Sequence, residues 1–199
     1  RSVAVAKFAD GRSCILTLAI KNYTRASELL ADSLLSTERR KKIIREIAQI
    51  AGKMHSANFA HQDFYLVHFF VGPDQNDKTY LRDLQRAILS QRYLADRWLV
   101  KDLAQLLFSS NKVANGDDLL TFKNEYCKYV PERKLNSLCS RIFKKSERLT
   151  RRAEKKEINY KKALTLCFLS CILQEFSNYW GIVRLFSNFL LLLSEANNH

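Results

Sequence analysis

The sequence predicts an α+β fold that is mostly helical and contains a small amount of sheet. Three observations lead to this prediction: a hairpin signal near the N-terminus, a second hairpin signal near residue 70, and long stretches in which apolar residues recur at helical spacing. The chain has 199 residues, of which 47% are hydrophobic, so it can bury one sizeable core. We therefore expect a single main domain.

The N-terminal hairpin signal consists of two strand-forming runs, Val3–Phe8 and Cys14–Ile20, joined by Ala-Asp-Gly-Arg. An Asp-Gly pair between two such runs is typical of a tight turn. After it, the leucine spacing over Thr24–Leu35 predicts a first helix.

A second helix is expected from an N-cap at Ser36 or Thr37 to about Ser56. Its isoleucines recur on one side, so this stripe is expected to face the core. His55 lies at its end and is expected to be a hydrogen-bonded core residue.

The central stretch contains two further strand-forming runs, Leu66–Val71 and Thr79–Leu84, separated by Gly-Pro-Asp-Gln-Asn-Asp. This pattern predicts a hairpin. Asp63 precedes the first run and Asp83 lies in the second, so the hairpin would have a carboxylate at either end.

The second half of the chain is predicted to be helical. Lys101–Ser109 has the composition of a buried helix, and Asp117 or Asp118 could cap the next helix, which would run through Tyr129. A long helix is expected from Glu132 to about Glu157, with an apolar stripe and a densely cationic face.

The net charge of +13 is concentrated in two places. Between Arg133 and Lys162 there are twelve Lys or Arg and three Glu, and Arg39–Lys42 with Arg45 forms a second cluster. Such clusters favour anionic partners: nucleotide phosphates, acidic lipid headgroups, phosphorylated glycolipid or nucleic acid. Alternatively, both are solvated basic faces with no dedicated partner.

The five cysteines have no C-x-x-C spacing and are odd in number, which is typical of reduced thiols in the cytosol. No secretory signal is visible at the N-terminus. After Lys162 the chain becomes apolar, but its apolar runs are short or interrupted, so buried or interfacial helices are expected rather than membrane spans. We expect the chain to divide into three parts: a pair of strands in residues 1–20, the main domain in residues 21–157 and an apolar helical extension in residues 158–199.

Three stretches in the same order carry a family resemblance: HQDFYLVHFFV from His61, LRDLQRA from Leu81 and RWLVKDLAQLLFS from Arg97. Together they resemble the bacterial lipopolysaccharide kinases, which phosphorylate Kdo or heptose in the inner core of lipopolysaccharide. The resemblance implies a protein-kinase-like fold, mainly the helical C-terminal lobe with a remnant of the N-lobe sheet. It also implies transfer of phosphate from ATP, with Mg²⁺, to a sugar hydroxyl.

The resemblance assigns roles to residues of the central stretch. Asp63, with His61 in the same catalytic loop, would be the catalytic base that takes the proton of the sugar hydroxyl. Asp83 would bind Mg²⁺. His68 stands where protein kinases have a second metal-ligating asparagine; it would bind the metal, a metal-bound water or a phosphate.

Further roles follow for residues on either side of the central stretch. Lys21, Asn22 and Tyr23 would form the hinge that contacts the adenine ring. Asp102 would accept hydrogen bonds from the catalytic-loop backbone; alternatively, it only complements a helix dipole.

Arg86, Arg97 and Lys101 are candidates for contact with an anionic sugar acid or core phosphate, or else ordinary surface cations. Gln62 replaces the arginine that usually receives an activation-loop phosphate, so no phosphorylation switch of that kind is expected.

The expected partners are the inner-core glycolipid and an anionic membrane surface, at the cytoplasmic side of the inner membrane, and no nucleic acid is expected. The phosphate-binding lysine and the glycine-rich loop of kinases are not found in the chain, so we expect them upstream of Arg1 and expect residues 1–199 alone to be a poor catalyst or none. Two alternatives remain open: a catalytically inactive kinase-like scaffold, and a basic nucleic-acid-binding module.

Overall fold

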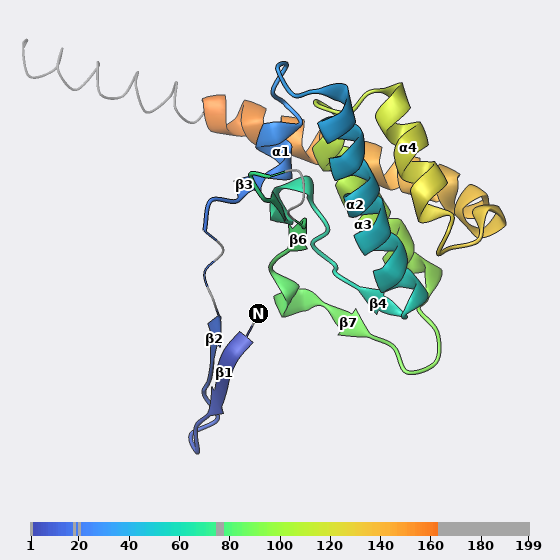
Figure 1. Cartoon of the computed structure of the whole chain (residues 1–199). Coiled ribbons are helices and arrows are strands. Elements are labelled where there is room, and N and C mark those ends of the chain that lie inside the picture. The colour runs from blue at the N-terminus through green and yellow to red at the C-terminus, as the bar shows by residue number, and fades with distance from the viewer. Residues whose placement is uncertain (1, 18, 20, 75–77, 163–199) are drawn as a thin grey trace, which may run out of the picture. The chain divides into compact units, whose positions relative to one another are not determined.

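The computed structural model describes residues 2–17, 19, 21–74 and 78–162 (Figure 1). Its internal contacts divide the chain into two compact units, Arg1–Leu149 and Thr150–His199. The described part is α+β and mostly helical, as predicted. The division expected from the sequence stays a prediction, and the apolar runs after residue 162 lie outside the described residues.

The N-terminal hairpin forms where its Asp-Gly turn predicts it. β1 (Ser2–Lys7) pairs antiparallel with β2 (Ser13–Thr17). Gly11 in the turn has a φ of 86°, a conformation that only glycine adopts without strain. The N–H of Phe8 closes the turn by donating to the carbonyl of Arg12 at 2.8 Å.

The first helix is much shorter than predicted. β3 (Thr24–Arg25) leads directly into α1 (Ala26–Leu29), which has only four residues. The chain then turns, because the Asp32 carboxylate accepts the N–H of Leu34 at 2.8 Å and so competes with a helical hydrogen bond. Leu34 is consequently 90% exposed, and the prediction of a helix over Thr24–Leu35 is wrong.

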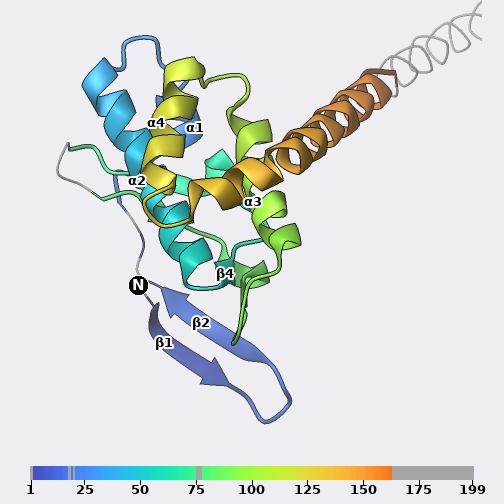
Figure 2. The same cartoon turned by 90° about the vertical axis from the view of Figure 1, so that its right-hand side faces the viewer.

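The longest helix of the first unit, α2 (Thr37–Ser56), supplies much of its core. Ser36 is the N-cap, and its Oγ accepts the N–H of Arg39 at 3.3 Å. α4 (Gly116–Tyr126) lies alongside α2 in both views (Figure 1, Figure 2). The buried apolar residues of α2 are Ile43, Ile44, Ile47, Ala48 and Ala51. The predicted helix and its core-facing stripe are therefore confirmed.

The central hairpin is present, but its strands are short. β5 (Phe69–Val71) pairs antiparallel with β6 (Tyr80–Leu81), and β3 pairs with β5. The 3-10 turn η1 (Leu66–His68) precedes β5, and the 3-10 turn η2 (Leu84–Arg86) follows β6, where the sequence predicted that the strands would continue. The predicted pairing is confirmed, whereas both predicted strands are too long.

A small sheet that the sequence did not predict joins the chain on either side of the central hairpin. β4 (Phe59–Ala60) precedes the hairpin and pairs antiparallel with β7 (Ile88–Leu89), which follows it. Strands of two residues show no hydrophobic periodicity, so the pattern of the sequence could not reveal them.

Two helix starts differ from the prediction. α3 (Asp96–Ser110) begins at Asp96 rather than at Lys101. The N-cap of α4 is Asn115 rather than one of the two aspartates that follow it: its Oδ1 accepts the N–H of Asp118 at 2.9 Å, and Asp118 Oδ2 accepts the N–H of Asn115 at 3.0 Å. This reciprocal pair is a capping box.

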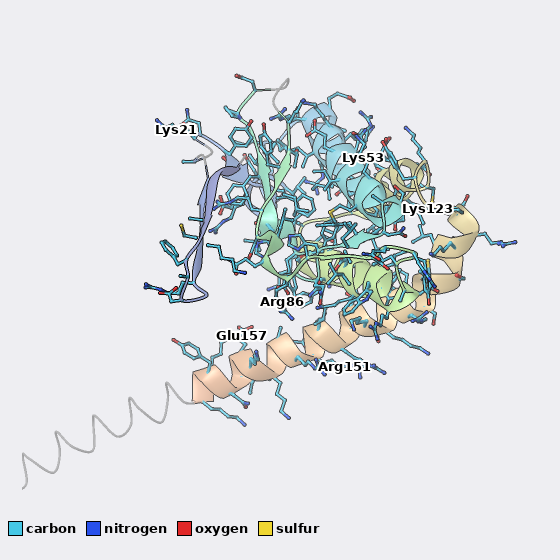
Figure 3. The ribbon with its side chains drawn as sticks, turned by 90° about the horizontal axis from the view of Figure 1, so that it is seen from below. Lys21, Lys53, Arg86, Lys123, Arg151 and Glu157 are labelled. Carbon is cyan, nitrogen blue, oxygen red and sulfur yellow. The ribbon has the colours of Figure 1, made fainter. Side chains whose placement is uncertain are left out.

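Residues 132–162 are helical, so this helix extends past the predicted end at Glu157. Within the first unit, Leu138 and Ile142 lie in the core. Within the second unit, residues 151–162 are all exposed, and Figure 3 shows Arg151 and Glu157 projecting from the helix. None of the helices in the described ranges is both long enough and apolar enough to cross a bilayer.

Candidate active site

The loop that carries Asp63 is held by α3. The fully buried carboxylate of Asp102 accepts the backbone N–H of His61 at 2.7 Å and that of Gln62 at 2.9 Å, one on each oxygen. His55 Nε2 lies 3.4 Å from the same carboxylate. A buried carboxylate is costly without such partners, so the three nitrogens stabilise Asp102 while Asp102 fixes the course of the loop.

Two further polar residues of α3 continue this contact. Gln105 Oε1 accepts the N–H of Phe64 at 3.1 Å, and Ser109 Oγ accepts the N–H of Leu66 at 2.8 Å. Positions three and seven residues after Asp102 lie on the same helix face, so one face of α3 binds the backbone of the whole loop. Sequence reasoning missed both residues; the available signal was their helical spacing within an otherwise apolar helix.

His61 connects the two segments that carry the aspartates. Its Nε2 lies 2.9 Å from the carbonyl oxygen of Arg82, the residue before Asp83. A carbonyl can only accept, so Nε2 carries the proton and Nδ1 accepts the N–H of Asp63 at 3.3 Å. The ring is fully buried, and both of its nitrogens are engaged. This geometry suits a positioning residue rather than a proton acceptor.

Asp63 is partly exposed and meets Arg86, whose Nη1 lies 3.2 Å from Oδ1. Gln62 supports this pair, because its Nε2 donates to the carbonyl of Arg86 at 2.6 Å and its Oε1 accepts from Lys101 Nζ at 3.3 Å. The side chain of Arg86 is 63% exposed, and an ion pair this exposed is weak. An anionic ligand could therefore compete with Asp63 for Arg86.

Asp83 begins η2 in the left-handed conformation, with φ 65° and ψ 57°. Gln62 also has a positive φ, of 69°. Such a conformation is uncommon for residues other than glycine, although aspartate tolerates it better than glutamine, and it tends to cluster at functional sites. Two of the four non-glycine residues with positive φ in the described ranges are thus Asp83 itself and the neighbour of Asp63.

The exposed carboxylate of Asp83 accepts no hydrogen bond from another described residue, so its oxygens are available to a ligand. In nucleotide sites Mg²⁺ is held by one or two carboxylates together with phosphates and water. Within residues 2–162 as described, no group of three His, Cys, Asp or Glu side chains is arranged to hold a metal ion. A single carboxylate of this kind is compatible with Mg²⁺ that is also held by phosphates and water, and the role of Asp83 as a metal ligand stays a prediction.

His68 lies at the base of the central hairpin. Its carbonyl accepts the N–H of Arg82 at 3.0 Å, and its half-buried ring lies 5.9 Å from the ring of His61, centroid to centroid. An imidazole therefore lies next to both aspartate-bearing segments. Its role toward a metal or a phosphate stays a prediction.

The predicted hinge residues Lys21, Asn22 and Tyr23 lie immediately before β3. Asn22 turns the chain with a φ of 61°, and the Tyr23 ring packs against Tyr80 of β6 with 5.4 Å between centroids. Because β3 pairs with β5, this segment is joined to the hairpin that leads to Asp83. Lys21 is exposed (Figure 3), and the adenine contact stays a prediction.

Arg97 and Lys101 flank the Trp98 ring at the start of α3. The guanidinium carbon of Arg97 lies 4.6 Å and Lys101 Nζ lies 5.8 Å from the ring centroid. Burial, followed by the charge of Arg86, lowers the pKa of Lys101. The structure therefore brings Arg86 and Lys101 to Asp63 and its neighbour Gln62, and places Arg97 one helical turn from Lys101.

The cationic cluster at the start of α2 is not simply a surface for anionic partners. Arg40 forms an ion pair with the buried Asp118 at 2.7 Å and donates to the carbonyls of Leu30 and Val113. This arginine is structural, which the charge pattern alone could not show.

The chain matches the model of a known protein family. The model of the lipopolysaccharide kinase (Kdo/WaaP) family matches residues 3–126. That range contains every residue assigned a role above, from Lys21 to Asp102.

Two similar proteins are also lipopolysaccharide kinases. The chain is 32% identical over 127 residues to the lipopolysaccharide core heptose(I) kinase WaaP of Escherichia coli K12, a match that covers 59% of the chain and 47% of that protein. A second Escherichia coli WaaP is 35% identical over 79 residues, covering 37% of the chain and 29% of that protein. The chain thus spans about half the length, or less, of these curated relatives.

A solved structure, "WaaP in complex with acyl carrier protein", resembles the chain with a TM-score of 0.63 and 26% identity. The superposition covers 75% of this chain and 68% of that one. The arrangement of helices and small sheets described above is therefore shared with it.

Proposed function

This chain belongs to the lipopolysaccharide kinase (Kdo/WaaP) family, and on that premise we propose that the protein containing it transfers the γ-phosphate of ATP to a sugar hydroxyl of the lipopolysaccharide inner core. Its fold is protein-kinase-like and corresponds mainly to the helical C-terminal lobe, as predicted. The observation that carries the proposal is the pairing of two loops: the Asp63 and Asp83 segments are joined by hydrogen bonds through His61, Gln62 and Arg86.

Phosphoryl transfer requires an oriented hydroxyl and neutralised phosphate charge, and little covalent chemistry from the protein. In our proposal Asp63 accepts a hydrogen bond from the acceptor hydroxyl. As the oxygen bonds to the γ-phosphorus and the bond to the ADP oxygen breaks, the proton passes to an Asp63 oxygen. Arg86 leaves Asp63 as the anionic acceptor binds, and Asp102 and His61 keep the loop in place throughout.

Asp83 would hold Mg²⁺, with His68 nearby as a ligand of the metal, of its water or of a phosphate. The ion would neutralise charge on the β- and γ-phosphates during transfer. Lys21, Asn22 and Tyr23 would contact the adenine through their backbone. These assignments rest on the geometry of the side chains that are present and on the family.

The acceptor is an inner-core heptose or a Kdo residue. Heptose is favoured because both curated relatives are named core heptose(I) kinases. The test uses the intact protein with ATP, Mg²⁺ and deacylated inner-core oligosaccharide, and locates any new phosphate by NMR. Phosphate on heptose or on Kdo supports the proposal and chooses between them. ATP binding without phosphate on any sugar favours the inactive scaffold instead.

We also propose that the protein works at the cytoplasmic face of the inner membrane. Residues 151–162 form an exposed helix that contains six Lys or Arg, and each cation near an anionic surface contributes about 1 kcal/mol of attraction. Binding to vesicles that contain anionic lipid, weakened by added salt, is the expected result. Equally tight binding to neutral vesicles would contradict it.

A second proposed partner is acyl carrier protein, with which the solved WaaP structure is in complex. One observation favours it: a cavity of about 200 Å³ between α2, α3, α4 and the helix that begins at residue 132 is lined almost entirely by apolar side chains such as Ile47, Leu106 and Phe122. This cavity could take an apolar group carried by such a partner. We expect acylated carrier protein to bind the intact protein more tightly than the unacylated form, as calorimetry would measure; equal affinities would contradict it.

A further inference from the structure

An open groove of about 640 Å³ lies along the segment Ile88–Trp98, between β7 and the first turn of α3. Two aromatic residues line it, Trp98 and Tyr93, and Tyr93 is 73% exposed. Two arginines line it as well, Arg92 and Arg97, and none of the described residues that line it is acidic. The groove is therefore both cationic and aromatic.

Asn58 fixes the wall of this groove. The residue adopts a positive φ of 57°, and its carbonyl accepts the N–H of Ser90 at 3.0 Å. Its side chain bridges the loop that follows: Nδ2 donates to the carbonyl of Arg92 at 3.4 Å, and Oδ1 accepts the N–H of Leu94 at 3.1 Å. Three contacts from one residue therefore hold loop 90–94 in a defined shape.

The same chain segments connect the groove to the candidate active site. Asn58 is followed by β4, which leads directly to His61 and Asp63, and β4 pairs with β7. Arg86, which bonds Asp63, lies just before β7. The groove thus has a fixed position relative to the proposed catalytic base.

We infer that this groove binds an anionic saccharide unit next to the sugar that is phosphorylated, and that Asn58 is the positioning residue that keeps the binding loop of the groove, residues 90–94, in shape. The inference rests on the proposed function and extends it. An arginine binds a carboxylate or phosphate through two parallel hydrogen bonds, and exposed aromatic rings offer apolar faces to sugar rings. The Trp98 ring holds Arg97 by a cation–π contact, which limits the entropy lost on binding.

The anionic group could be a sugar-acid carboxylate or a phosphate on the neighbouring sugar. The probe is the deacylated inner-core oligosaccharide, used in three forms: unmodified, with its carboxyl groups reduced to alcohols, and with its phosphates removed. Whichever form loses affinity for the wild-type protein identifies the anion. If neither modification weakens binding, no anion is recognised and the inference is overturned.

The test substitutes Arg92→Gln and Arg97→Gln in the intact protein. Loss of a charge-assisted hydrogen bond should raise the Kd and the KM for the oligosaccharide about tenfold to a hundredfold, with the KM for ATP unchanged. Arg12→Gln, in the turn between β1 and β2, removes the same charge from a residue that does not line the groove and is the matched control. An oligosaccharide Kd that is unchanged, or that rises equally in Arg12→Gln, overturns the inference.

Calorimetric titration measures the Kd of the oligosaccharide directly, so binding in the groove is tested independently of phosphate transfer. If the wild type binds the oligosaccharide but transfers no phosphate, the proposed function fails and the groove is still tested by its Kd.

Asn58→Gly keeps the positive φ but removes both side-chain bridges to loop 90–94. We expect the KM for the oligosaccharide to rise while kcat at saturation and the KM for ATP stay at wild-type values. A purely structural residue would instead lower kcat and raise both KM values together with a fall in Tm, and that result would overturn the positioning role.

Discussion

Asp102 is the residue on which the shape of the proposed catalytic loop depends. Its two oxygens accept the N–H groups of His61 and Gln62, and the residue is fully buried. The resemblance led us to expect this contact. The sequence pattern alone also allowed Asp102 to act only by complementing the helix dipole. An aspartate in a helical segment does not show which part of the chain it contacts in the fold.

We predict that Asp102→Asn lowers kcat for phosphate transfer about tenfold to a hundredfold. The carboxamide would present N–H donors to one of the two backbone N–H groups, so the loop would lose a hydrogen bond and shift. Asp96→Asn on the same helix is the control, because Asp96 is exposed and forms an ion pair with Lys134 at 3.4 Å rather than with the loop of Asp63. Equal kcat values for the two variants would contradict the role of Asp102.

At the residue scale, the sequence revealed charged residues better than neutral ones. Asp63 and Asp83 stood out because carboxylates flanked a hairpin. Gln105 and Ser109 did not, although they bind the same loop, because Gln and Ser are common on helices without a special role. Arg40 was grouped with surface cations, since its buried partner Asp118 is distant in the sequence.

At the scale of elements, α2 was predictable because its N-cap and its stripe agree. The helix over Thr24–Leu35 failed because the Asp32 side chain redirects the backbone, a local competition that leucine spacing does not show. The first central strand begins later than predicted because Leu66 donates its N–H to Ser109 of α3 instead of to a neighbouring strand.

α2 packs at Gly52 against Tyr129, which follows α4, so we expect a larger residue at Gly52 to destabilise the fold. A Cβ there would lie 2.6 Å from Tyr129 Cδ2 and 2.8 Å from Tyr129 Cβ, too close for the ring to remain in place. Gly52→Ala should lower the free energy of unfolding by about 1–3 kcal/mol in urea titrations, despite the better helix propensity of alanine. Gly116→Ala meets no atom within 4 Å and should be neutral or stabilising; a similar loss there would contradict this explanation.

The contact between α2 and α4 also predicts a dependence on pH. Hydrogen bonds from Lys128 Nζ at 2.7 Å and from Gln49 lower the pKa of Glu125 below its ordinary value of 4.5, although burial opposes them. A lowered carboxyl pKa stabilises the folded state above the unfolded pKa, and this stabilisation is lost as pH falls through the folded pKa. Glu125→Gln should therefore lose less stability between pH 6 and pH 3 than the wild type, as thermal melts would show; an equal loss would contradict it.

At the scale of the whole molecule, Arg40 ties together segments that are distant in the sequence. It bonds the carbonyls of Leu30 and Val113 and pairs with Asp118, the residue that completes the capping box of α4. The end of α1, the start of α2 and the loop before α4 therefore meet at one guanidinium.

Arg40→Met should lower the free energy of unfolding by about 3–5 kcal/mol, because it leaves the Asp118 carboxylate buried without its partner. Urea denaturation of the first unit within the intact protein would measure this. Arg45→Met removes the same charge from an exposed position on the same helix and should change stability little. Equal losses in the two variants would show that the network around Arg40 is not stabilising.

The fold class and the family were predictable because the motifs that carry them are contiguous. The sheet between β4 and β7, and the groove beside it, were not, because they depend on pairing between segments that flank a hairpin and have no periodicity of their own.

The most direct test of the account is single-turnover phosphate transfer by the intact protein and its Asp63→Asn variant, with ATP and inner-core oligosaccharide. We predict a rate about 10²–10⁴ lower for the variant, with unchanged affinity for ATP, because the amide cannot take the proton of the acceptor hydroxyl. A variant that transfers phosphate at the wild-type rate would contradict the role of Asp63 and the site built around it.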